Sequence, residues 1–159
     1  MTPTKGTWSA LCCTSKAATQ VANIALENQY SDFLVVIKDL EEQYSNPSKP
    51  PTEPFEPPFV GQDVETCWET LAAMIVQTRS DLDSESFAIL DDRSAEDESA
   101  LLVLVIEGDA AKEGFEIDKV RVDLRLVSFI LQSWNAKGDN IPELEAEAAR
   151  SPDGVVRRV

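Results

Sequence analysis

Apolar residues recur along this chain with two different periods, which separate helices from strands. Helical spacing, with an apolar side chain every three or four residues, runs through 14–30, 63–79 and 123–138. A shorter helix is predicted over 142–149, where Pro142 suits the first turn. The pattern therefore predicts four helices.

Continuous apolar runs predict the strands, at 33–37, 87–90 and 100–106. The first run is rich in β-branched residues, so we expect it to be buried on both faces and central in the sheet. The short segment between the second and third runs favours an antiparallel hairpin. A fourth strand is predicted over 115–122, where the alternation slips near 118–119 as it would at a bulge. A polar turn at 108–114 precedes it.

These elements predict one α/β domain over 1–159, with a mixed sheet of about four strands and helices packed against it. Its main sheet and helices occupy 61–150, and the N-terminal helix occupies 14–30.

The proline-rich loop at 46–58 interrupts the regular elements, because six of the nine prolines lie there. One interpretation is a lid or a ligand for another protein, with Phe55 and Phe59 as apolar anchors that bind a ligand. The other is a long connection that these two phenylalanines tie to the surface.

The chain has no histidine and three cysteines, which excludes Ser-His-Asp and Cys-His catalysis, histidine-containing zinc sites and all-cysteine tetrahedral zinc sites. Cys12, Cys13 and Cys67 are interpreted as structural thiols. Any chemistry would depend on carboxylates, Arg, Lys, Tyr, a thiol or the shape of a pocket.

The net charge of −15 is concentrated in the middle of the chain, because 61–114 holds 14 acidic residues against 3 basic ones. Such a field repels nucleic acid and anionic lipid, so we expect neither as a partner. A basic protein remains a candidate partner, and a solvated acidic surface is the alternative. The longest apolar run is too short for a membrane span, and the start lacks a secretory stretch, so a soluble, cytoplasmic protein is expected.

Three polar residues, Asp91, Asp92 and Arg93, follow a predicted buried strand and form the candidate catalytic group. Strand ends are where α/β sheets present binding groups, and two carboxylates beside a guanidinium can differ in pKa as an acid and a base do. The alternative is a local cap or ion pair. A metal site that adds Glu96 and Asp97 is conceivable, but a solvated acidic loop is preferred and no metal is predicted.

No dinucleotide or P-loop fingerprint occurs, so no cofactor is predicted. Trp68 and Trp134 fall on the inward faces of predicted helices. They are interpreted mainly as core residues, with lining of an apolar ligand pocket as the alternative.

The segments FAILDDRSAEDESALLVLVI and PELEAEAARSPDGVVR resemble a family of small acidic microbial proteins of uncharacterised function. The resemblance implies an α/β domain with an early strand, a helix, a unit of two strands joined by an acidic-arginine turn, and a last acidic helix before a D-G-V-x-R ending. The matching positions are 33–37, 63–79, 87–106, 143–149 and 153–157. The resemblance implies no catalytic residues, and it leaves out the N-terminal helix and the proline-rich loop.

Two function classes fit these observations. The first is a soluble binding or adaptor domain without catalytic apparatus, which explains the missing catalytic groups directly. The second is a cofactor-independent cyclase or isomerase of small-molecule metabolism, which would bind a small apolar molecule and act by holding it in a reactive conformation.

Overall fold

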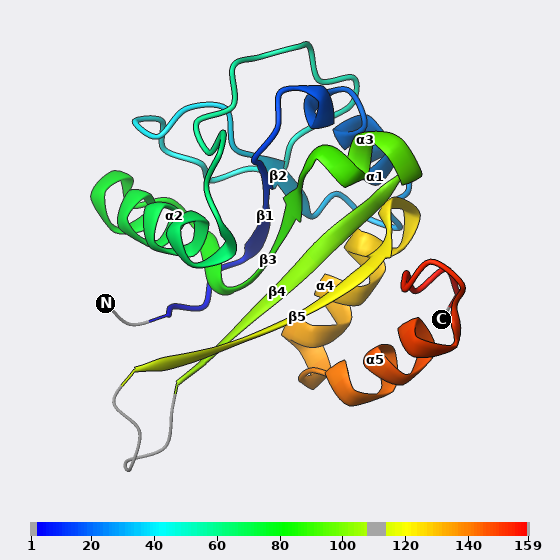
Figure 1. The fold of residues 1–159 in the computed structure, drawn as a ribbon. Coiled ribbons are helices and arrows are strands. Elements are labelled where there is room, and N and C mark those ends of the chain that lie inside the picture. Colours follow the sequence, from blue (N-terminus) through cyan, green and yellow to red (C-terminus); the bar gives the residue numbers. More distant parts are fainter. Residues whose placement is uncertain (1–2, 108–113, 159) are drawn as a thin grey trace.

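The computed structural model describes residues 3–107 and 114–158 (Figure 1). Its elements are β1 Trp8–Cys13, η1 Ala17–Thr19, α1 Ala22–Glu27, β2 Leu34–Val36, α2 Val64–Thr78, β3 Leu82–Leu90, α3 Asp92–Asp97, β4 Ser99–Glu107, β5 Phe115–Asp123, η2 Leu124–Leu126, α4 Val127–Lys137 and α5 Ile141–Arg150. The polar turn predicted at 108–114 lies, apart from Gly114, outside the described residues.

The five strands form one mixed sheet in the order β2-β1-β3-β4-β5. Strand β1 is parallel to both of its neighbours, whereas β4 is antiparallel to β3 and to β5. Helices pack on both faces, which confirms the predicted single α/β domain with a mixed sheet. The strand that the sequence pattern missed is β1, because its short run contains Ser9 and two cysteines and gives no clear strand period.

Strand β2 lies at an edge of the sheet, so the prediction that this strand is central is wrong. It is nevertheless fully buried, because a loop rather than another strand covers its outer side. The Ser48 N–H donates to the Leu34 carbonyl at 2.9 Å, and the Val36 N–H donates to the Ser48 hydroxyl at 2.9 Å. Burial on both faces therefore did not require a central position.

Two further expectations are corrected. The predicted helix at 14–30 is instead η1 followed by the short helix α1. Strand β5 has no bulge, since its pairing with β4 keeps one register from Ser99 opposite Asp123 to Glu107 opposite Phe115. Its charged residues break the apolar alternation because β5 is an edge strand that the helices cover only in part.

Each face of the sheet has its own hydrophobic core. Helix α2 covers one face, and α1, α4 and α5 cover the other (Figure 1). Helix α2 begins where the predicted range 63–79 begins, with the Asp63 carboxylate accepting from the Thr66 N–H at 2.8 Å as the N-cap. The proline-rich loop contains no helix or strand, as expected from its composition.

An irregularity in β3 shapes the side of the sheet beneath α2. Along β1, Ser9 pairs with Asp83 and Leu11 with Ala88, so β3 holds extra residues that bulge out of the ladder. The N-terminal segment runs against this bulge, where the Ser84 N–H donates to the Thr4 carbonyl at 2.9 Å. Gly6 allows the close approach, because a Cβ atom there would lie 2.3 Å from the Leu82 carbonyl carbon.

The substitution Gly6→Ala is therefore expected to displace the N-terminal segment and to lower the free energy of unfolding by about 1–3 kcal/mol. Urea denaturation followed by circular dichroism measures the loss. The neighbouring variant Thr7→Ala keeps the backbone N–H that donates to Asp81 and should change stability by less than about 0.5 kcal/mol. Equal stabilities of the two variants would show that the close approach at Gly6 carries no constraint.

Candidate functional site

The carboxyl ends of parallel strands form the usual ligand-binding edge of an open α/β sheet. Here α1 follows β1 on one face of the sheet, and α2 follows β2 on the other. In this chain its own segments cover that edge. The Gly61 N–H donates to the Thr14 carbonyl at 3.1 Å, and the Lys16 ammonium lies 2.7 Å from the Glu56 carboxylate. The end of the proline-rich loop thus lies where a ligand would be expected.

Asp91 follows β3 and is held by contacts within the protein. It caps α3 by accepting from the Ser94 N–H at 3.1 Å, while its own N–H donates to the Ser94 hydroxyl. The Arg121 guanidinium binds both carboxylate oxygens, with Nη1 at 3.1 Å from Oδ1. Burial alone raises the pKa of Asp91, but the hydrogen bonds and charge of Arg121 outweigh it and leave the pKa below its usual value.

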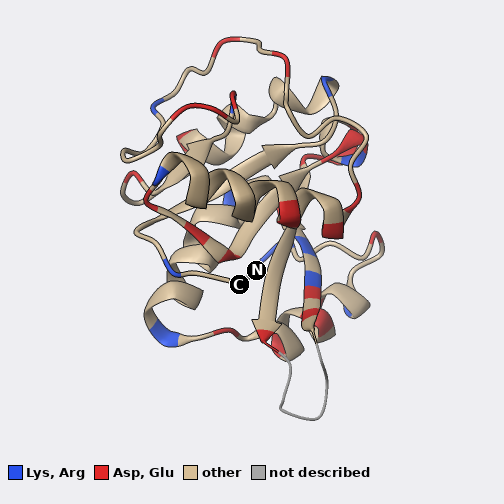
Figure 2. Ribbon diagram, turned by 90° about the vertical axis from the view of Figure 1, so that its left-hand side faces the viewer, with Lys and Arg blue, Asp and Glu red and all other residues tan. Residues whose placement is uncertain are grey.

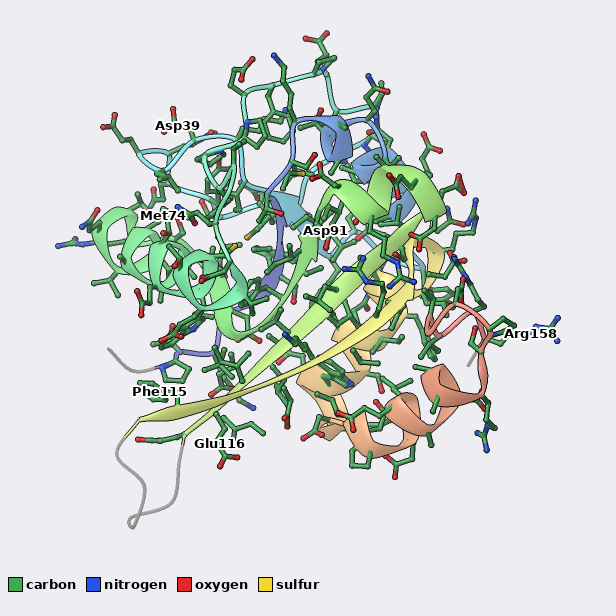
Figure 3. The ribbon with its side chains drawn as sticks, in the orientation of Figure 1. Asp39, Met74, Asp91, Phe115, Glu116 and Arg158 are labelled. Carbon is green, nitrogen blue, oxygen red and sulfur yellow. The ribbon has the colours of Figure 1, made fainter. Side chains whose placement is uncertain are left out.

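The other two members of the candidate catalytic group point to different surroundings. Asp92 is exposed in the first turn of α3. The Arg93 guanidinium binds Asp97, with Nε at 2.7 Å from Oδ2, and donates to the Asp153 carbonyl. Asp91 and Arg93 thus bind different partners, Arg121 and Asp97 respectively. Figure 3 labels Asp91 near the end of β3.

Trp68 lies on α2 above the bulge of β3 and is 5% exposed. Its indole N–H donates to the Ser84 carbonyl at 3.0 Å. Its ring meets Phe115 of β5 in an edge-on arrangement, with centroids 5.2 Å apart and planes at 61°. The pair joins α2 to the start of β5, and the hollow described below opens beside it.

The other aromatic candidates are structural in their contacts. Trp134 is buried on α4 and donates its indole N–H to Asn140 Oδ1 at 2.8 Å. Phe59 is wholly buried in the core under α2. Phe55 packs against the opposite core, with the Lys38 ammonium 5.9 Å from its ring centroid.

A hollow of about 580 Å³ lies between α2 and the start of β5. Its lining residues are Glu65, Trp68, Glu69, Gly114, Phe115 and Ile117. Glu65 and Glu69 are one helical turn apart and exposed, and neither forms an ion pair with another described residue. Figure 2 shows acidic bands at this end of α2, close to the β4–β5 hairpin. The hollow therefore combines an aromatic floor with a negatively charged rim.

A smaller crevice of about 140 Å³ contains a buried carboxylate, Asp83. Lys5, Glu85, Ser86, Leu104, Trp134, Asn135, Gly138 and Asp139 complete its lining. Asp83 is 3% exposed and accepts from the Glu85 N–H at 2.8 Å and from the Ser86 hydroxyl at 3.3 Å. Burial raises the pKa of Asp83 to about 6, since these hydrogen bonds only partly offset the loss of solvent.

The sequence predicts Trp68 mainly as a core residue, with lining of an apolar pocket as the alternative, and it does not predict the residues around it. Glu65, Trp68 and Glu69 have the spacing of one helix face, so the sequence does carry that signal. Phe115 joins them only through the fold of the sheet. Asp83 has no signal, because its burial depends on the bulge in β3.

Among residues 3–107 and 114–158, no group of three or more acidic or cysteine side chains could hold a metal ion. Within the same ranges, every helix is too short or too polar to cross a membrane.

The raised pKa of Asp83 predicts a stability that falls as the pH rises. The protonated carboxyl favours the folded state, so its contribution is complete below about pH 4 and is lost as the pH passes about 6. Over this range the free energy of unfolding should fall by about 3 kcal/mol. The variant Asp83→Asn should show no such fall, and above pH 7 it should be more stable than the unmodified protein. Urea denaturation from pH 4.5 to 7.5 measures the difference.

Asp139→Asn is the matched control, because it removes the same charge from an exposed position of the same crevice. It should keep the pH dependence of the unmodified protein. A similar slope in the unmodified protein and in Asp83→Asn would contradict the assignment to Asp83.

Comparisons with known proteins do not assign the chain to a family. No family model, curated protein or solved structure matches the chain. The resemblance of its motifs to small acidic microbial proteins remains an interpretation of those motifs.

Proposed function

We propose that this chain is a non-catalytic binding domain that takes a lysine or arginine side chain of a basic protein segment into the hollow between α2 and β5. The observation that carries the proposal is the placement of two exposed glutamates, which form no ion pair with another described residue, beside the Trp68–Phe115 ring pair. Carboxylates and aromatic rings together are the groups that recognise organic cations in proteins.

The shape of the hollow suits a long cationic side chain better than a compact ion. The apolar stem of lysine or arginine can lie on Phe115 and Ile117 while its charged end reaches Glu65 and Glu69. Figure 3 shows Phe115 on the α2 side of the hairpin, facing the hollow, with Glu116 on the opposite side. Among the described residues, no basic side chain already forms an ion pair with Glu65 or Glu69, so both carboxylates can bind a cation.

The charge of the whole protein favours the same partner. A net charge of −15 attracts basic segments over distances of about one Debye length and raises their rate of association. The aromatic floor then adds selectivity, because a solvated acidic surface alone does not orient a cation.

A second candidate is the cofactor-independent cyclase or isomerase, and one observation favours it. Asp83 has a pKa near neutrality at the bottom of a crevice, as general acid–base catalysis requires. The crevice of about 140 Å³ is smaller than the roughly 300–1,000 Å³ of common ligand pockets. The binding function therefore ranks first.

The binding proposal predicts how glutamate substitutions change affinity for a basic peptide. The probe is the acetylated and amidated hexapeptide Val-Lys-Val-Lys-Val-Lys, titrated calorimetrically at low salt. The double variant Glu65→Gln/Glu69→Gln should weaken binding about tenfold, because each lost contact with a cation is worth about 0.5–1 kcal/mol.

The control is Glu143→Gln/Glu147→Gln on α5, which removes the same charge at the same helical spacing far from the hollow in sequence. It should weaken binding less than about twofold. Equal losses in both double variants would reduce the interaction to general charge attraction and overturn the proposal. Binding of the corresponding Val-Glu peptide would overturn it as well.

A further inference from the structure

Strand β5 forms an open edge of the sheet over most of its length. It pairs with β4 on one side along its whole length. On its other side the tail of the chain covers only the end: the Val156 N–H donates to the Arg121 carbonyl at 2.9 Å, and the Asp123 N–H donates to the Val156 carbonyl at 2.8 Å. The rest of this edge has no strand neighbour among the described residues.

The bonds to Val156 reveal which backbone groups of β5 point away from β4. Arg121 and Asp123 face outward, and the groups of a strand alternate in direction with every residue. Phe115, Ile117 and Lys119 therefore also direct their N–H and C=O groups outward. Among the described residues these groups form no backbone hydrogen bond on that side, so they can pair with another extended chain.

The tail shows which chemistry suits this edge. It lies beside β5 as an extended segment whose two valines, Val155 and Val156, are buried. The next residue, Arg157, binds the carboxylate of Asp123 at the end of β5, with Nη1 at 2.9 Å from Oδ2. An apolar and basic extended segment thus already occupies one end of the edge, and the acidic charge of the protein favours the same composition farther along.

The open part of the edge lies directly beside the cation-binding hollow. Phe115 and Ile117 contribute side chains to the hollow and backbone groups to the edge. The β4–β5 hairpin extends beyond the helices that cover the sheet (Figure 1), and Lys119 is exposed. A strand added here would carry alternate side chains on the α2 side of the sheet, within reach of Glu65 and Glu69.

We propose that the partner of this protein binds as an extended basic segment that adds a strand to β5 along residues 115–119. This inference rests on the proposed cation-binding function and names the conformation of the partner. Main-chain hydrogen bonds hold the segment, and its lysine or arginine side chains enter the hollow, which is the division of roles found when peptides add to sheet edges.

Amide hydrogen exchange in the unmodified full chain tests the conformation. With the Val-Lys hexapeptide bound at saturation, the amides of Phe115, Ile117 and Lys119 should exchange at least about tenfold more slowly. The amides of Glu116 and Asp118 point toward β4 and should change much less. Protection of neither set, in a complex that depends on Glu65 and Glu69, would overturn strand addition and leave the cation-binding function standing.

A proline substitution supplies the second test. Lys119→Pro removes an outward N–H without breaking the ladder to β4, a position where edge strands tolerate proline. Lys119→Ala is the matched control, because it removes the same charged side chain and keeps the N–H. The proline variant should bind the hexapeptide at least about fivefold more weakly than the alanine variant.

Equal affinities of these two folded variants would overturn strand addition. If Lys119→Pro does not fold, the exchange pattern of the unmodified chain decides the question. No binding of the hexapeptide at any salt concentration would overturn the proposed function and this inference together.

Discussion

The ion pair between Arg121 and Asp91 is the interaction on which one end of the sheet depends, the end where β3 stops and α3 begins. It joins β5 to the turn after β3, and Asp91 at the same time caps α3. Because both side chains are largely removed from water, loss of either would leave an uncompensated charge. Arg157 adds two more ion pairs at this end of the sheet, because it binds Asp123 and Asp153. These contacts hold the C-terminal segment against β5. Asp91 thus contributes to the structure twice, as a helix cap and as an ion-pair partner.

The bulge in β3 organises the opposite end of the sheet, where β3 begins. The extra residues turn the Ser84 carbonyl toward the indole of Trp68, and the ring of Trp68 then meets Phe115. Gly6 lets the N-terminal segment support the bulge from the other side. A backbone irregularity therefore positions the aromatic floor of the hollow. The two ends of the sheet therefore differ in their charged groups. Ion pairs of Arg121 and Arg157 hold one end, whereas the exposed carboxylates of Glu65 and Glu69 lie at the other.

Local patterns predicted the fold well where one segment carries its own signal. Helix α2 has its Asp63 cap and a clear apolar face, and the β3–β4 hairpin follows from the short segment between two apolar runs. The patterns failed where neighbours decide the outcome: β1 becomes a strand between β2 and β3, and β2 is buried by a loop. The candidate site shows the same division, because the helix spacing of Glu65 and Trp68 is local, whereas Phe115 arrives from a distant strand.

The two edges of the sheet are unequal, and this asymmetry limits how copies of the chain can assemble. Ser48 and its loop occupy the outer groups of β2, so that edge offers no template for another strand. A β5 edge of one molecule has no complementary β2 edge on the next, and head-to-tail growth of a continuous sheet is blocked. Pairing through β5 can only close on itself or end at one partner. The covered edge thereby protects an acidic protein with an open strand from forming fibres.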